Sequence, residues 1–205
     1  MDTSRKNCHM TFDVKMEDFR RKARLVAGGH VTETPSAITF ASVVLIETVR
    51  ISLTLSDLND FPVKVEDIKN AYITVPITEK IWTVLGCEFG EDSGRKATVV
   101  HGFFGLKIAG AAFRNHLADC MHHMELLPCP DELDLWMKHM VRPYDGFNYY
   151  AYLLIYVDNV MVIHHDADSV LRRMNKYFNF NTSSIGNPDI YLGSKFKKMR
   201  LENGV

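Results

Sequence analysis

Two acidic residues stand at the ends of apolar stretches, where they could hold divalent metal ions. Asp158 lies in the apolar, β-branched run 153–163, which predicts a hairpin with Asp158-Asn159 as its turn, because both side chains tolerate positive φ. Asp67 closes a second strand-like stretch that begins at Phe61. Two strand-end carboxylates suit a site whose metal ions clamp the attacking and leaving oxygens of a phosphoryl transfer. The alternative is that these acids serve only as turn or helix-capping residues.

Short blocks along the chain stand in one order around these acids, at residues 22–30, 39–44 with 47–50, 67–72, 102–107, 156–159 and 190–193. Block 156–159 reads Tyr-Val-Asp-Asn. Together the blocks resemble the reverse transcriptase of copia-type LTR retrotransposons, whose corresponding box is Tyr-x-Asp-Asp. The similarity runs from about Phe12 to Gly204, nearly the whole chain.

The resemblance implies a catalytic centre in which Asp67, Asp158 and Asn159 hold the catalytic positions. Two Mg²⁺ ions, with Mn²⁺ as an alternative ion, would be bound by Asp67, Ile68 and Asp158. The family has Asp where this chain has Asn159. Asn keeps a carbonyl acceptor but loses the charge that a hard cation prefers. We therefore expect the rate to fall by roughly two orders of magnitude or more.

The resemblance also implies residues that contact the substrates. The ring of Tyr72 would lie under the incoming sugar and exclude a 2′-hydroxyl, although a packed core aromatic is the alternative. Lys22 and Arg24 suit the triphosphate, with Arg20 or Arg21 as substitutes and solvent-facing charge as the alternative. The expected nucleotide-binding residues are Lys22, Arg24, Asn70, Ala71 and Tyr72. The expected template and primer contacts are Gly105, Lys107, Tyr156 and Val157.

The composition is that of a globular protein. Of 205 residues, 46% are hydrophobic and 24% charged, and the net charge is −1. The sequence has no apolar run long enough for a membrane span and no signal-peptide pattern at its start. Its four cysteines are widely spaced, which favours a reducing compartment over a disulfide framework.

Charge is distributed unevenly along the chain. Residues 1–30 hold seven Lys or Arg against four Asp or Glu, and residues 171–205 hold seven against two, so the centre is acidic. Basic flanks could contact nucleic-acid phosphates while the acidic centre attracts metal. The alternative is that these charges form solvated faces.

The periodicity predicts an α+β fold in which strands and helices interleave. We expect strands at 12–15, 22–28, 61–67, 81–85, 97–100 and 190–199, a hairpin at 149–163, and helices at 43–59, 109–127 and 168–178. Ser42 is the expected N-cap of the first helix. By resemblance, 1–205 is a single reverse transcriptase domain with fingers at about 12–60 and 73–105. The palm, an antiparallel sheet backed by helices, would occupy about 61–72 and 106–205. The thumb and ribonuclease H domains of the family would be missing, as in a fragment of a Pol polyprotein.

The expected function is RNA-directed DNA polymerase activity. Its partners would be an RNA or DNA template with primer and deoxynucleoside triphosphates, in the cytoplasm (virus-like particle) or nucleus. One alternative is a non-catalytic, nucleic-acid-binding remnant of a decayed retroelement. A second is a zinc-binding interaction module built on His116, Cys120 and His123, whose spacing places them on one helix face.

Overall fold

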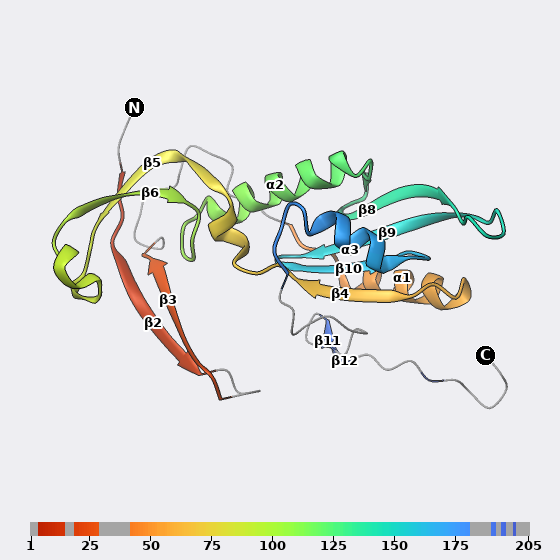
Figure 1. Cartoon of the computed structure of the whole chain (residues 1–205), viewed down its shortest axis with the longest axis horizontal. Coiled ribbons are helices and arrows are strands. Elements are labelled where there is room, and N and C mark those ends of the chain that lie inside the picture. The colour runs from red at the N-terminus through yellow and green to blue at the C-terminus, as the bar shows by residue number, and fades with distance from the viewer. Residues whose placement is uncertain are drawn as a thin grey trace. The chain divides into compact units, whose positions relative to one another are not determined.

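The computed structural model describes residues 4–14, 19–28, 42–180, 190–191, 194–195 and 199 (Figure 1). The chain divides into two compact units. Unit 1 comprises Met1–Ala41 and Asn70–Leu117, and unit 2 comprises Ser42–Lys69 and Ala118–Val205. Helix α1 (Ile46–Leu58) lies in unit 2. The fingers and palm ranges expected from sequence stay predictions.

Unit 2 is built on a five-stranded sheet of order β4-β10-β9-β8-β7, in which all neighbours are antiparallel. Its strands are β4 (Val63–Asp67), β7 (Leu127–Cys129), β8 (Glu132–Val141), β9 (Asn148–Tyr156) and β10 (Asn159–Ile163). The predicted strand ending at Asp67 and the predicted hairpin over 149–163 are confirmed. Strands β7 and β8 were not predicted.

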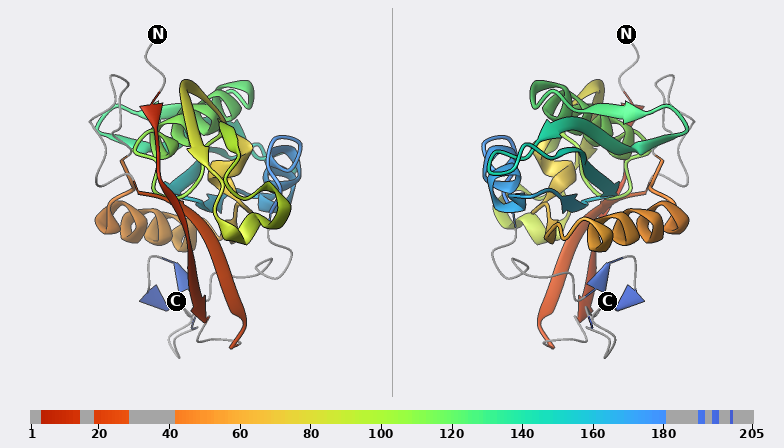
Figure 2. Two further views of the ribbon diagram at one scale, coloured as in Figure 1. Left: turned by 90° about the vertical axis from the view of Figure 1, so that its left-hand side faces the viewer. Right: turned by 90° about the vertical axis from the view of Figure 1, so that its right-hand side faces the viewer.

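Helices cover both faces of this sheet, because its central strands are apolar on both sides. Val65, Leu154 and Met161 point to one face and share a buried core with Val49 of α1. Helix α3 (Ala167–Met174) lies on the other face (Figure 2). Its buried side chains pack there, and Asp168 forms a 3.6 Å ion pair with Lys64. The strands are therefore enclosed by helices on each side.

Unit 1 contains a three-stranded sheet of order β1-β5-β6 and a separate hairpin formed by β2 and β3. Buried residues Ala27, Ile81, Leu106 and Ile108 form the centre of its core. The predicted strands at 12–15, 22–28, 81–85 and 97–100 all fall mainly within longer observed strands. The elements are β1 (Ser4–Arg5), β2 (Cys8–Val14), β3 (Arg21–Ala27), the 3-10 helix η2 (Ala71–Thr74), β5 (Pro76–Val84), the 3-10 helix η3 (Cys87–Asp92) and β6 (Lys96–His101).

The N-terminus of α1 differs from the prediction. The helix begins at Ile46 after the N-cap residue Leu45, so Ser42 is not its cap. A carboxylate from β8 serves instead: Glu132 Oε2 accepts hydrogen bonds from the Leu45 amide at 3.1 Å and from Thr48 Oγ1 at 3.3 Å. An acid at this end also complements the helix dipole.

Helix α2 (Ala109–His123) is four residues shorter than its predicted end at 127. Glu125 adopts a left-handed backbone with φ of 64°. Its amide donates to the His122 carbonyl at 2.8 Å, and the Leu126 amide donates to the Met121 carbonyl at 3.0 Å. This is the Schellman pattern of helix termination, formed here with Glu in the position where Gly is usual. The sequence therefore carried no glycine signal for the end of the helix.

Two further elements differ from the predictions. Helix α3 begins at Ala167, capped by Asp166, whose Oδ1 accepts from the Ser169 amide at 3.0 Å, and it ends at Met174 rather than 178. The single strand predicted at 190–199 is wrong in its described part. Instead β11 (Ile190–Tyr191) and β12 (Ser194–Lys195) pair antiparallel with one another. Tyr191 is buried, and its hydroxyl donates to the Leu154 carbonyl at 3.2 Å.

Candidate active site

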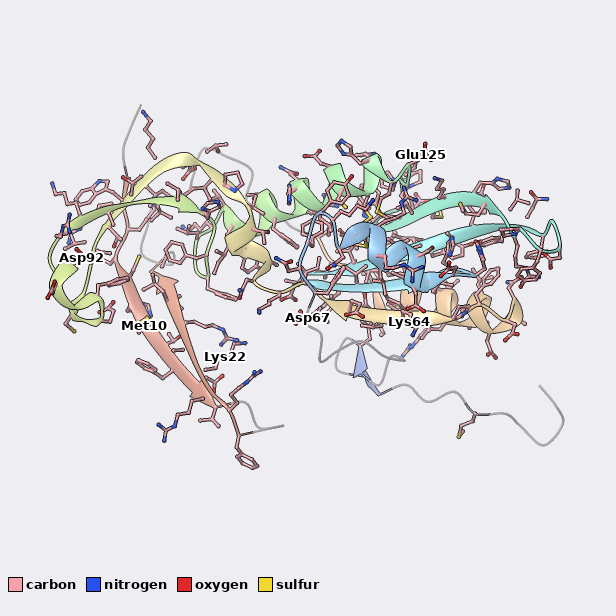
Figure 3. The ribbon with its side chains drawn as sticks, viewed as in Figure 1. Met10, Lys22, Lys64, Asp67, Asp92 and Glu125 are labelled. Carbon is pink, nitrogen blue, oxygen red and sulfur yellow. The ribbon has the colours of Figure 1, made fainter. Side chains whose placement is uncertain are left out.

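The three residues predicted to be catalytic lie together at one end of the unit 2 sheet. Asp67 is the last residue of β4 (Figure 3), and Asn159, the first of β10, is its directly opposed partner. Directly opposed side chains of an antiparallel pair point to the same face, with Cβ atoms about 4.5–5.5 Å apart. Asp158 precedes Asn159 in the turn, and all three side chains are partly buried.

The turn between β9 and β10 is formed by Val157 and Asp158, one residue earlier than predicted. Asn159 pairs with Tyr156, which leaves only these two residues in the loop. Val157 has a φ of 56°, and Asp158 is not among the positive-φ residues, a pattern typical of a type II′ turn. Positive φ is strained for a β-branched residue, by about 1–3 kcal/mol. Val157 is also 38% exposed, so the burial of its side chain offsets little of this strain.

Backbone hydrogen bonds tie this turn to the segment that follows Asp67. The Ile68 amide donates to the Asp158 carbonyl at 2.8 Å, and the Lys69 amide donates to the Asn179 carbonyl at 2.8 Å. The Ile68 side chain is 1% exposed, which anchors the segment in the core of unit 2. The two acids therefore have fixed backbone positions relative to one another.

Asn159 contributes a hydrogen-bond donor to the site. Its Nδ2 donates to Asp158 Oδ1 at 3.2 Å, an interaction that the Asp of the family pattern could not provide while ionised. The donor set of two carboxylates and one amide oxygen consists of hard oxygen ligands, which fits Mg²⁺. Within the described ranges, no group of three or more His, Cys, Asp or Glu residues could hold a metal ion.

In unit 1, Phe104 brings together two of the predicted nucleotide-binding residues. The Arg24 guanidinium lies 5.3 Å from the centre of the Phe104 ring, and Tyr72 meets the same ring edge-on at 5.4 Å. Tyr72 also meets Phe113 edge-on at 6.1 Å. The Tyr72 ring is therefore held between two aromatic neighbours while its side chain stays partly exposed. Phe104 belongs to block 102–107, but the sequence analysis assigned it no role. Its position next to Gly105 could have indicated that it lies near the site.

The other predicted nucleotide contacts flank these two. Lys22 lies two residues before Arg24 on β3, so strand alternation directs both side chains to the same side of the hairpin. Asn70 adopts a left-handed backbone, with φ of 56° and ψ of 38°, that turns the chain into η2, and Asn tolerates this conformation better than most residues. Ala71 follows and is 5% exposed.

The glycines of block 102–107 have a clear structural reason. Gly105 has a φ of 85°, and a Cβ atom there would lie 2.1 Å from the Ala27 carbonyl oxygen. A Cβ atom at Gly102 would lie 2.8 Å from the Tyr72 carbonyl oxygen. Both positions therefore need glycine so that the loop can pack on β3 and η2. Lys107 is partly buried just before α2. The template and primer roles of Gly105 and Lys107, and of Tyr156 and Val157 at the hairpin, stay predictions.

The structure does not assemble the zinc site that the helix spacing suggested. Cys120 is 2% exposed, and burial raises the pKa of its thiol to about 11, which disfavours the thiolate that binds metal. The His123 Nδ1 is engaged with the Asp119 carbonyl at 2.7 Å. Within the described part of the chain, these two residues and His116 do not form a group that could hold a metal ion.

The model of the family described as reverse transcriptase (RNA-dependent DNA polymerase) matches residues 4–201. The chain therefore belongs to the reverse transcriptase family. No curated protein sequence matches the chain significantly. In the part of the chain that the structure describes, no helix has the length and apolar character needed to cross a membrane.

Proposed function

We propose that this chain is the polymerase domain of a copia-type retroelement and that it extends a primer at a centre formed by Asp67 and Asp158. One observation carries the proposal. The register of β4 and β10 places Asp67 opposite Asn159, and the Ile68–Asp158 backbone hydrogen bond fixes the second acid beside them. Acids 91 residues apart in sequence thus share one end of one sheet.

The reaction would be attack of the primer 3′-hydroxyl on the α-phosphate of a deoxynucleoside triphosphate, with pyrophosphate leaving. Bound Mg²⁺ supplies the positive charge that stabilises the transferring phosphoryl group. Asp67, Asp158 and the Ile68 carbonyl are the groups that would hold it. The chain's contribution is to keep two carboxylates in fixed positions, which lowers the reorganisation that the reaction requires.

The nucleotide would be oriented by residues of unit 1. Arg24 and Lys22 carry the positive charge that suits a triphosphate. The Tyr72 ring, restricted by Phe104 and Phe113, is suited to reject a 2′-hydroxyl because it has little freedom to move away. The template and primer would pass Gly105, Lys107, Tyr156 and Val157.

Asn159 would make this centre slow. The site has two negative charges where the family pattern has three, and one oxygen of Asp158 already accepts the Asn159 amide. This observation also favours a second candidate function, a remnant that binds primer-template without extending it.

Primer extension on an RNA template tests the proposal, with the 205-residue chain and its Asp67→Asn variant compared in excess Mg²⁺. Asp131→Asn is the matched control, because Asp131 is an exposed loop residue of the same unit. We expect slow extension by the parent and the control and none by Asp67→Asn. Equal extension by all three proteins would refute the role of Asp67. Salt-sensitive binding with no extension by the parent would favour the remnant.

A further inference from the structure

The outward face of the β1-β5-β6 sheet is a surface that the proposed reaction does not use. Along β5 the side chains alternate, with Ile81 1% exposed and Thr83 6% exposed on the inner face. Trp82 lies between them and points outward, where it is partly exposed. Its cross-strand partner Thr98 on β6 is also exposed.

This outward face is positively charged. Its exposed cations are Arg5, Lys80 and Lys96, one from each strand of the sheet. Strands β1 and β6 contain no Asp or Glu, and the one acid of β5, Glu79, lies in the stretch between Pro76 and Ile81 where the register with β6 shifts. The acids of η3 lie in the turn beyond the strand ends, where Asp92 forms an ion pair with Arg95.

Two of these cations flank the Trp82 ring. The Arg5 guanidinium lies 5.7 Å from the ring centre, and the Lys96 ammonium lies 4.9 Å from it. Because β1 and β6 lie on opposite sides of β5, the two charges approach the indole from opposite sides. Neither cation has a carboxylate partner among the described salt bridges. Their mutual repulsion would be relieved by an anion that bridges them.

We propose that this face binds single-stranded nucleic acid, with phosphates at Arg5, Lys80 and Lys96 and one base stacked on Trp82. A base would have to displace the Lys96 ammonium from the indole. An exposed cation–π contact contributes about 0.5–1 kcal/mol, whereas stacking of a base on an aromatic side chain contributes about 1–3 kcal/mol. Stacking therefore prevails, and the released ammonium remains free to neutralise a phosphate.

Single strands fit this surface better than a duplex. The bases of a duplex are stacked on one another and cannot lie flat on a side chain, whereas an unpaired strand exposes their faces. The inference rests on the proposed function, because the single strand bound on this face would be the unpaired part of the template. This face would add a contact to the template that the catalytic residues do not provide. Its binding should not depend on the nucleotide sequence of the strand.

Trp82 offers a direct readout, because the chain has two tryptophans and the other, Trp136, is 5% exposed. In a Trp136→Phe variant, tryptophan emission comes from Trp82 alone. Oligo-dT should quench this emission, and the affinity should fall with salt at a slope of about −2 for three phosphate contacts. Lys80→Gln with Lys96→Gln should reduce the slope by about 1.4, whereas the exposed Lys176→Gln control should leave it unchanged.

Anisotropy of a labelled oligonucleotide gives a second measurement on the parent chain, should Trp136→Phe fold poorly. Trp82→Ala should weaken binding about tenfold or more, and Lys176→Gln should not. Oligonucleotide binding with unchanged Trp82 emission would overturn the inference. A change in Trp82 emission that depends on protein concentration alone would also overturn it, because it would indicate that a second copy of the chain covers this face. Primer extension without any binding of oligo-dT would overturn this inference and leave the proposed function standing. A chain that neither binds oligo-dT nor extends a primer would overturn both this inference and the proposed function.

Discussion

Replacing Asn159 by Asp should raise polymerase activity and lower the stability of the metal-free protein. Asn159 is directly opposed to Asp67 across β4 and β10 and donates a hydrogen bond to Asp158. An aspartate at 159 would add the third carboxylate of the family pattern. It would also place a negative charge beside two others and remove that hydrogen bond.

The size of each effect follows from the geometry. Two carboxylates about 5 Å apart repel by about 3 kcal/mol at an effective dielectric of about 20, and solvent at this partly exposed sheet end reduces the figure to about 1–2 kcal/mol. Loss of the side-chain hydrogen bond adds about 1 kcal/mol. The metal-free variant should therefore be about 2–3 kcal/mol less stable, which lowers Tm by about 5–10 °C in a chain of this size. Restored ligand charge should raise the extension rate by about 100-fold.

The assay pairs single-nucleotide primer extension in excess Mg²⁺ with thermal melting in EDTA and in Mg²⁺. Asn115→Asp, an exposed residue of α2, is the matched control and should change neither quantity. Mg²⁺ should stabilise the Asn159→Asp variant more than the parent, because it neutralises the added charge. A variant that extends no faster than the parent and melts at the same temperature in EDTA would refute the reasoning.

Three other changes have defined outcomes. Tyr72→Ala should let ribonucleotides compete about tenfold better in primer extension, because the ring no longer fills the 2′ position, and an unchanged ratio would make Tyr72 a packing residue. Val157→Gly should stabilise the protein by about 1 kcal/mol in urea unfolding by removing strain at φ of 56°, so lower stability would show that the turn is not strained. His164 is 5% exposed, and burial lowers its pKa from 6.5 to about 4, so the folded state binds its proton less readily than the unfolded state. The free energy of unfolding should therefore keep its full value above pH 6.5 and fall as the pH drops toward 4, by about 3 kcal/mol at most. His164→Phe should flatten the dependence of the unfolding free energy on pH across that window.

The hairpin and the strand before Asp67 could be predicted from sequence because their apolar, β-branched runs admit one secondary structure. The meeting of Asp67 with Asn159 at one sheet end followed from the resemblance, and the register shows it directly. The turn was misplaced by one residue because Asp and Asn tolerate positive φ better than Val does. Pairing of Asn159 with both Tyr156 and Asp67 overrides that local preference.

Other features depend on contacts that no local pattern encodes. The N-terminus of α1 is capped by Glu132, whose carboxylate accepts a hydrogen bond from the Leu45 amide although the two residues lie 87 positions apart. The end of α2 is set by Glu125 in a conformation usually taken by glycine, so the helix pattern continued past its real end. The packing of Arg24 and Tyr72 on Phe104 joins residues far apart in sequence.

The central claim is that Asp67 and Asp158 form one binding site for a divalent cation, and local cleavage by iron tests it most directly. Fe²⁺ with ascorbate generates radicals that cut the backbone beside a bound ion, and the fragments can be mapped by mass spectrometry. We predict cuts near residues 67 and 158 together, their suppression by excess Mg²⁺, and their loss in Asp67→Asn but not in Asp131→Asn. Cuts elsewhere in the chain, or cuts at these positions that persist in Asp67→Asn, would contradict the account.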